Sequence, residues 1–173
     1  MDPSRRRILQ VGLAGGALLA VGGVGLAVMP GALTPPRRPL RALTPRQYAV
    51  LAAFAERTCP RGDGWPSADQ LDVAGFVDDQ LAECPPTLAE EVGAGLLLLE
   101  NALVGLLLDG RPRTFTGSSP EQQDRILAAW RDSRFAVRRS VIKGVGSLCA
   151  VAYWSSPEIW PRAGYPGPPE VPG

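Results

Sequence analysis

Apolar residues recur every three to four positions along most of the chain after residue 42, which is the spacing of one face of an α-helix. The first such segment, residues 43–57, begins with Thr44 and Pro45, which favour the cap and the first position of a helix. Gln47 completes a capping box with Thr44. The predicted apolar face comprises Tyr48, Leu51, Phe54 and Ala55. Residues 59–66 then end the helix, because they contain two prolines and two glycines.

A second, shorter helix is predicted over residues 73–81, where four apolar residues align on one side. They are Val73, Phe76, Val77 and Leu81. Asp78 and Asp79 are expected to face water on the other side. Adjacent residues of a helix point about 100° apart, so these two carboxylates cannot converge on one substrate atom as a catalytic pair.

Residues 87–108 differ from the other segments, because apolar side chains surround the predicted helix on nearly every side. The sequence Thr-Leu-Ala-Glu of residues 87–90 predicts a capping box at its start. A helix that is apolar all round, here over residues 92–108, is expected to be the buried, central helix of a bundle. Glu100 and Asn101 interrupt its middle, which argues against a membrane span. We expect Glu100 at a bend, at an edge or in contact with a partner.

Two more helices complete the predicted fold. One runs from Ser119 to about Asp132, and the other from about residue 134 to Tyr153. Their apolar faces comprise Ile126, Leu127 and Trp130 in the first and Val137, Val141, Val145, Leu148 and Ala152 in the second. No segment alternates as a strand would. The prediction is an all-α domain over residues 43–154, a small bundle of about five helices around a buried central helix.

The first 32 residues have the order of a signal peptide: a basic stretch, an apolar stretch without charge, and a turn-like end. The basic stretch resembles the twin-arginine export motif, with isoleucine where phenylalanine is usual. The matching residues are Ser4, Arg5, Arg6, Ile8 and Leu9. No clean Ala-x-Ala cleavage site precedes the linker of residues 33–42, so removal of the signal and its retention as an inner-membrane anchor both stay open. Either way, the motif predicts a periplasmic protein.

Charge and histidine content exclude several functions. The formal net charge is +1, so nothing indicates a nucleic-acid partner. The chain contains no histidine, which removes the commonest general base, the commonest transition-metal ligand and the covalent haem motif. No evident pair of carboxylates replaces it. We therefore predict no catalytic, cofactor-binding or metal-binding residue in this chain.

The three cysteines lie far apart and lack metal-ligand spacing. Cys59, Cys84 and Cys149 are either small buried apolar residues or, in an oxidising compartment, disulfide partners. In the second case Cys149, which precedes the aromatic tail on the last helix, is the candidate for a bond to another chain. Cys59 and Cys84, which bracket the second helix, are then the internal pair.

Four large aromatic residues are concentrated among prolines near the C-terminus: Tyr153, Trp154, Trp160 and Tyr165. Because prolines prevent helix and sheet formation, residues 155–173 are predicted to form an extended tail. Large rings on a stiff segment lose little entropy on docking, as expected of a partner-binding arm. The alternative is that the tail folds back and buries these rings against its own bundle.

Residues 43–47, 73–77, 119–127 and 153–168 together resemble the gluconate 2-dehydrogenase subunit 3 family. The most specific part is Ser-Pro-Glu-Ile-Trp followed by Gly-Tyr-Pro-Gly-Pro in the tail. Members of this family resemble small subunits of periplasmic or membrane-bound flavin-dependent sugar and alcohol dehydrogenases. The resemblance implies a large flavoprotein partner that carries FAD, a cytochrome c subunit that takes the electrons, and passage of the complex through the twin-arginine translocase.

The predicted function is therefore that of a non-catalytic accessory subunit, which supplies the export signal and escorts a folded, cofactor-loaded partner. The residues themselves agree with it, since the twin-arginine route carries folded proteins and this chain has no evident cofactor site that would require such a route. The alternative is a free-standing periplasmic or membrane-anchored helical binding module, which would need no enzyme beside it.

Overall fold

The computed structural model describes residues 34–101 and 113–168. The predicted export signal, residues 1–32, and the second half of the helix predicted over residues 92–108 lie outside them. The described residues form the helices α2 (Pro45–Thr58), α3 (Val73–Ala82), α4 (Pro86–Glu100), α6 (Pro120–Arg131), α7 (Ala136–Trp154), η1 (Pro157–Ile159) and α8 (Trp160–Ala163). Apart from an isolated bridge between Gly62 and Trp65, these residues contain no β-structure, and the predicted all-α fold is confirmed.

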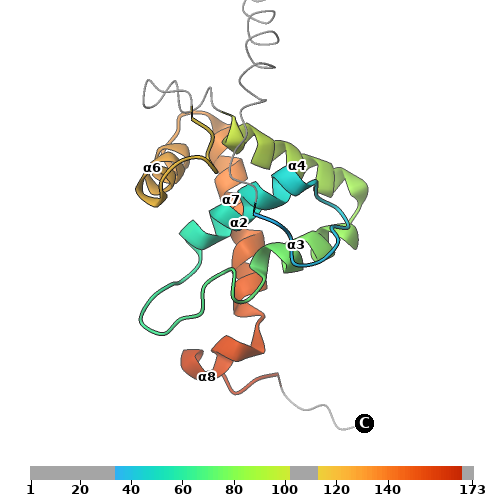
Figure 1. The fold of residues 1–173 in the computed structure, drawn as a ribbon, viewed down its shortest axis with the longest axis vertical. Helices are drawn as coiled ribbons and strands as arrows, with labels where there is room; N and C mark the ends of the chain where they lie inside the picture. The colour runs from blue at the N-terminus through green and yellow to red at the C-terminus, as the bar shows by residue number, and fades with distance from the viewer. Residues whose placement is uncertain (1–33, 102–112, 169–173) are drawn as a thin grey trace, which may run out of the picture.

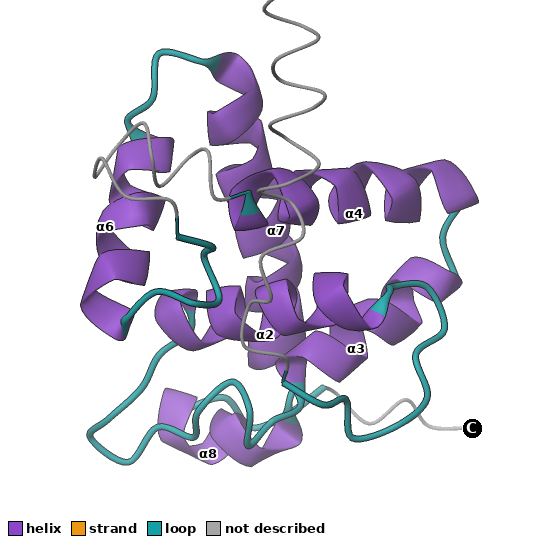
Figure 2. Ribbon diagram, turned by 45° about the horizontal axis from the view of Figure 1, so that its top comes forward, coloured by secondary structure: helices purple, strands orange, loops and turns teal. Residues whose placement is uncertain are grey.

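Helices α2 and α7 lie at the centre of the bundle. Helix α7 contacts α2, α3, α4 and α6, and α2 also contacts α3, α4 and α6. Figure 1 shows α7 running along the domain, with α6 beside its first turns and α8 beyond its last turn. In the turned view of Figure 2, α2 and α3 lie next to each other across α7. The largest fully buried side chains are Trp130, Tyr153, Phe54, Phe115 and Leu51.

The sequence rules for helix starts hold in α2 and α6. The side chains of Thr44 and Ser119 each accept a hydrogen bond from the backbone N–H three residues on, and the glutamine there bonds back to the cap. The capping box predicted at residues 87–90 is wrong, because α4 already begins at Pro86 and has no side-chain cap. Proline suits the first helical position, since its φ is preset and its missing N–H leaves no donor unpaired.

The described part of the predicted central helix, α4, is buried on one face only. Leu96 and Leu99 are buried, whereas Leu97 and Leu98 are 40% and 38% exposed. Gly95 lets α4 approach α7 closely: an added Cβ would lie 3.0 Å from a side-chain atom of α7. Burial on every face is therefore wrong for these residues, because α4 packs along one side of α2 and α7.

Glu100 ends α4 and is 1% exposed. Its carboxylate accepts one hydrogen bond from the backbone N–H of Thr116 (2.9 Å) and another from the Thr116 hydroxyl (2.6 Å). The buried acid is thus satisfied within its own chain, where it fastens the loop before α6 to the end of α4.

The apolar face predicted for the last helix is only partly buried. Val145 and Ala152 belong to the core, as predicted, but Val137 is 58% exposed. Val137 lies in the first turn of α7, where the helix projects past the core. The last turn of α7 also exposes side chains, since Val151 is 59% and Trp154 47% exposed.

Candidate functional site

The end of α7, together with η1 and α8, brings together the aromatic residues that the sequence singles out (Figure 1). With two residues that the sequence analysis missed, they form a cluster that we call the aromatic end: Trp65, Tyr153, Trp154, Trp160, Arg162 and Tyr165. The prediction of an extended tail is wrong for residues 157–163, which are helical. Pro157 and Pro161 stand in the first two positions of η1 and α8, where proline is tolerated.

Tyr153 belongs to the core. It is 0% exposed, and its hydroxyl donates a hydrogen bond to the carbonyl oxygen of Pro66 (2.9 Å). Burial raises the pKa of the Tyr153 phenol. Ile159, in the tail, is also fully buried. The tail therefore folds back at these two residues, and the Tyr153 ring does not reach the surface on which a partner would bind.

The loop of residues 59–66 forms the other wall of the aromatic end. Three successive residues, Gly62, Asp63 and Gly64, have positive φ angles of 76°, 50° and 79°. The guanidinium of Arg162 lies 5.2 Å from the centre of the Trp65 ring and packs on Gly64, where an added Cβ would lie 2.7 Å from Arg162 Nη1. Glycine at position 64 thus satisfies both the backbone angle and the close approach of the tail.

Two rings of the aromatic end are open to solvent. Trp154 and Tyr165 are each 47% exposed. Trp154 meets Trp65 edge to face at 5.7 Å, and Tyr165 meets Trp160 at 5.4 Å. The indole N–H of Trp160 donates to the carbonyl oxygen of Trp154 (3.3 Å), which ties the two pairs together. Half-exposed rings held in fixed positions are typical of interface hot spots, because little freedom is lost on binding.

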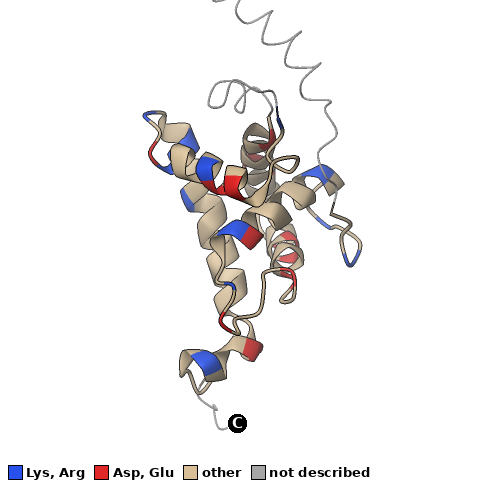
Figure 3. Cartoon of the chain, turned by 60° about the vertical axis from the view of Figure 1, so that its left-hand side comes forward, with Lys and Arg blue, Asp and Glu red and all other residues tan. Residues whose placement is uncertain are grey.

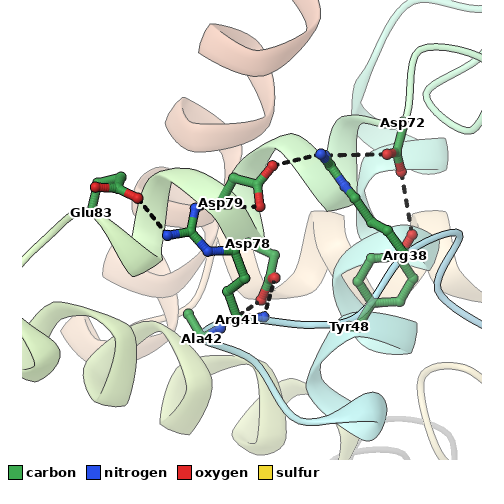
Figure 4. Close-up of polar contacts among 8 residues, drawn as sticks. All are labelled: Arg38, Arg41, Ala42, Tyr48, Asp72, Asp78, Asp79 and Glu83. Atoms are coloured by element: carbon green, nitrogen blue, oxygen red, sulfur yellow. Dashed lines mark hydrogen bonds and ion pairs between the residues drawn. The ribbon is translucent and has the colours of Figure 1, made fainter.

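A separate cluster of polar contacts fastens the linker to α3 (Figure 4). Asp78 is 2% exposed, and its carboxylate accepts hydrogen bonds from the backbone N–H groups of Arg41 (2.7 Å), Ala42 (3.1 Å) and Leu43 (2.7 Å). We call this contact the linker clasp. The expectation that Asp78 faces water is wrong. The linker runs outside any helix, and the carboxylate satisfies N–H groups that would otherwise be buried unpaired.

Ion pairs surround the linker clasp (Figure 4). Arg38 pairs with Asp79 (2.6 Å) and Asp72 (3.3 Å), and Arg41 pairs with Glu83 (2.6 Å). The two arginine side chains are 45% and 52% exposed, so solvent screens these ion pairs and they contribute little to stability. The buried carboxylate, more than the exposed pairs, fixes the path of the linker.

All three cysteines are free thiols in the structure, as in the first of the two alternatives, and Cys59 and Cys84 are not joined. The Cys59 thiol instead donates to the carbonyl oxygen of Cys149 (3.9 Å). Cys149 is 1% exposed, which leaves its thiol no access to another chain. Burial raises the pKa of Cys59 to about 11 and also raises that of Cys149, so both thiols stay protonated and unreactive at neutral pH.

Two kinds of feature are absent from residues 34–101 and 113–168. No three or more histidine, cysteine, aspartate or glutamate side chains gather there in a way that would hold a metal ion. No helix of this part of the chain is both long and apolar enough to cross a membrane.

The helical fold and the aromatic end define a class: a small all-α protein that presents a rigid, partly exposed aromatic surface. The family follows from comparison with known proteins. The family model described as gluconate 2-dehydrogenase subunit 3 matches residues 45–167, and the chain belongs to this family. The resemblance drawn from the sequence is confirmed. No curated protein matches the chain, and no solved structure matches it.

Proposed function

We propose that this chain is the non-catalytic small subunit of an exported flavin-dependent sugar or alcohol dehydrogenase complex. The family supports the proposal, because its name describes a subunit of a multi-subunit dehydrogenase and so implies catalytic partner subunits. In this proposal the large subunit carries FAD and performs the oxidation, and a cytochrome c subunit takes the electrons. The chain itself supplies no reacting group.

The aromatic end supports the proposal that a partner subunit docks on this chain. Trp154 and Tyr165 expose 47% of their surface each, and Val151, one helical turn before Trp154, exposes 59%. The two rings are already held by Trp65 and Trp160, so a partner would meet a preformed apolar surface. We propose that the large subunit covers this surface.

In this proposal the N-terminal segment is the signal for export. Arg5 and Arg6, followed by an uncharged apolar stretch, fit the twin-arginine translocase. That route accepts folded cargo, so the large subunit would bind FAD, fold, dock on this chain and cross the membrane with it. The complex would then function in the periplasm, with the N-terminal segment either removed or kept as an inner-membrane anchor.

The docking step is tested by capturing the tagged full chain from its native periplasm and membranes, with mass spectrometry and a flavin absorbance spectrum of the co-eluting proteins. We expect a flavoprotein in stoichiometric amount. A colourless monomer would overturn the proposal and favour a free-standing binding module. The variant Trp154→Ala/Tyr165→Ala should lose the flavoprotein, and the matched control Leu97→Ala/Leu98→Ala, which truncates two exposed residues on α4, should retain it.

The export step is tested with Arg5→Lys/Arg6→Lys, which keeps the charge of the signal and changes the arginine pair that the translocase recognises. We expect both this chain and the flavoprotein to accumulate in the cytoplasm. Export of the flavoprotein without this chain would show that it travels independently.

A further inference from the structure

The turn between α6 and α7 carries a concentration of positive charge that the proposed docking function does not use. We call residues 131–143 the basic turn; they comprise the last residue of α6, the connection and the first eight residues of α7. They contain five basic residues and one acidic residue. The whole chain has eighteen basic and seventeen acidic residues. Outside the basic turn there are thirteen basic and sixteen acidic residues, so the rest of the chain has a net negative charge. Figure 3 shows basic segments at this end of the molecule, away from α8. The five are Arg131, Arg134, Arg138, Arg139 and Lys143.

The cations of the basic turn form no ion pair with acidic residues among residues 34–101 and 113–168. In the described part of the chain, the ion pairs involve arginines of the linker, of α2 and of the loop after α2, and none involves residues 131–143. The Arg139 guanidinium donates to the backbone carbonyl of Ser133. The charge of the basic turn is therefore available to a ligand from outside the chain.

Two of these cations are stacked on an exposed ring. The guanidinium groups of Arg134 and Arg138 lie 4.9 Å and 5.3 Å from the centre of the Phe135 ring, and Arg138 also lies 5.5 Å from the Trp130 ring. Stacking occupies the flat face of a guanidinium and leaves its edge N–H donors free, and these donors match the oxygens of a phosphate group. Phe135 itself is 48% exposed, and Val137 beside it is 58% exposed.

The local sequence breaks the rules for a helix start at this point. Helix α7 has Phe135 at its cap position, no side-chain cap and no acidic residue in its first turn. Instead Arg138 and Arg139 follow at once, next to the positive end of the helix dipole, where cations are unfavourable. Helices α2 and α6 have complete capping boxes, whereas α3 and α4, like α7, have no side-chain cap, so it is the pair of arginines in the first turns that distinguishes α7 from the other uncapped helices. A local cost of this kind is expected where function requires the residues.

We propose that the basic turn binds the surface of an anionic phospholipid bilayer. Phosphate oxygens of the lipid headgroups accept hydrogen bonds from the arginine edges, and Phe135 and Val137 enter the region between headgroups and acyl chains. An acidic protein surface would explain the charges, but it would leave the exposed phenylalanine, set between two cations, in a polar contact. The proposal does not depend on the dehydrogenase partner or on retention of the N-terminal segment.

The test is hydrogen–deuterium exchange of the full chain with two kinds of vesicle, pure phosphatidylcholine and phosphatidylcholine mixed with phosphatidylglycerol. We expect protection of the peptide that spans residues 131–143 with the anionic vesicles only. Because the readout is local, membrane binding through the N-terminal segment cannot imitate it. Equal protection by both vesicles, or no protection by either, would overturn the proposal.

A pair of matched variants tests which charges are responsible. Arg134→Gln/Arg139→Gln should weaken partitioning onto anionic vesicles about 30-fold, because each charge near the membrane surface contributes a factor of about five and the variant removes two. The control Arg61→Gln/Arg113→Gln removes the same charge from exposed residues outside the basic turn and should change partitioning less than twofold. Equal loss in both would show a net-charge effect and overturn the proposal. Protection of residues 131–143 by a captured protein partner in the absence of vesicles would assign the basic turn to a protein interface instead.

Discussion

The two ends of α7 differ in how completely their side chains are satisfied within the chain. At the aromatic end the Tyr153 hydroxyl, the Trp160 indole N–H and the Arg162 guanidinium all contact the protein's own groups. At the basic turn the arginines contact aromatic rings, and none of them forms an ion pair with an acidic residue of the part of the chain that the structure describes. One end is a preformed apolar surface, and the other is a set of unpaired charges. Binding at the first should depend on shape and vary little with salt, whereas binding at the second should weaken as salt screens it.

The largest expected effect comes from reversing charge in the basic turn. Arg139→Glu/Lys143→Glu changes the local charge by four units and should weaken partitioning onto anionic vesicles about 1,000-fold. Capture of the flavoprotein should be unchanged, because Arg139 and Lys143 lie about 22 Å and about 16 Å from Trp154 along α7. Vesicle sedimentation of the full chain measures this, with Arg139→Lys/Lys143→Arg as the charge-preserving control. If partitioning onto anionic vesicles fell by less than tenfold, the basic turn would not be the charged binding surface that distinguishes it from the aromatic end.

The next effect is the loss of the exposed indole at the aromatic end. Trp154→Ala should weaken the affinity for the proposed flavoprotein partner about 30- to 100-fold, as for a central aromatic residue of an interface. Trp154→Phe should keep most of the affinity, because a ring still packs against Trp65. Titration calorimetry measures both variants. Vesicle partitioning should be the same in both, and a decrease in it would mean that the two ends are not independent.

The rigidity of the aromatic end is tested by two glycines of the same loop. Both Gly62 and Gly64 have positive φ, but only at Gly64 does an added Cβ meet Arg162. Gly62→Ala should lower the free energy of unfolding by about 1 kcal/mol through backbone strain alone. Gly64→Ala should lower it slightly more, by about 1.5 kcal/mol, because the end of the Arg162 side chain must also move off the Trp65 ring. Urea denaturation distinguishes them, and equal losses would show that the Arg162 contact contributes nothing to stability.

The cost of the uncapped start of α7 is tested by Phe135→Asp. An aspartate at the cap position can accept a hydrogen bond from the first turn and interacts favourably with the helix dipole, so stability should rise by about 1 kcal/mol. Partitioning onto anionic vesicles should fall in the same variant. Phe135→Ala, which offers no cap, should lose partitioning without the gain in urea resistance. A destabilised Phe135→Asp protein would show that the Phe135 ring serves the fold.

The smallest effect concerns alkaline pH. Burial raises the pKa of Cys59 from 9.0 to about 11, so the unfolded chain loses this proton first. The stabilising contribution is complete below pH 9 and decreases as pH rises from there toward 11, by about 1 kcal/mol at pH 10. Cys59→Ala should remove this part of the alkaline loss. Urea denaturation at pH 8 and pH 10 measures it, and an identical pH dependence in the variant would exclude Cys59 as a cause.

The helices were predictable because their signals are local. Thr44 with Gln47, and Ser119 with Gln122, specify a helix start within four residues, and both capping boxes form as predicted. The position of a helix within the bundle is not a local property. For that reason the apolar pattern of α4 did not reveal that Leu97 and Leu98 face solvent.

Contacts between distant residues could not be predicted. Asp78 looked like a solvated acid beside Asp79, and only the folded chain brings the N–H groups of residues 41–43 to it. Trp65 and Arg162 lie almost a hundred positions apart, and no spacing rule connects them. The signal that was available for Trp65 is its place in a loop rich in glycine and proline, where a large exposed ring would otherwise have no partner.

The linker clasp also protects one specific peptide bond from proteolysis. Trypsin cleaves after arginine, and the Arg41–Ala42 bond lies between two residues whose N–H groups are held by Asp78. A protease needs this backbone to detach, which requires movement of α3 and does not require the whole domain to unfold. The rate of cleavage at this bond therefore measures how often α3 opens, and comparison of that rate with and without a bound partner would show whether docking at the far side of the domain closes it.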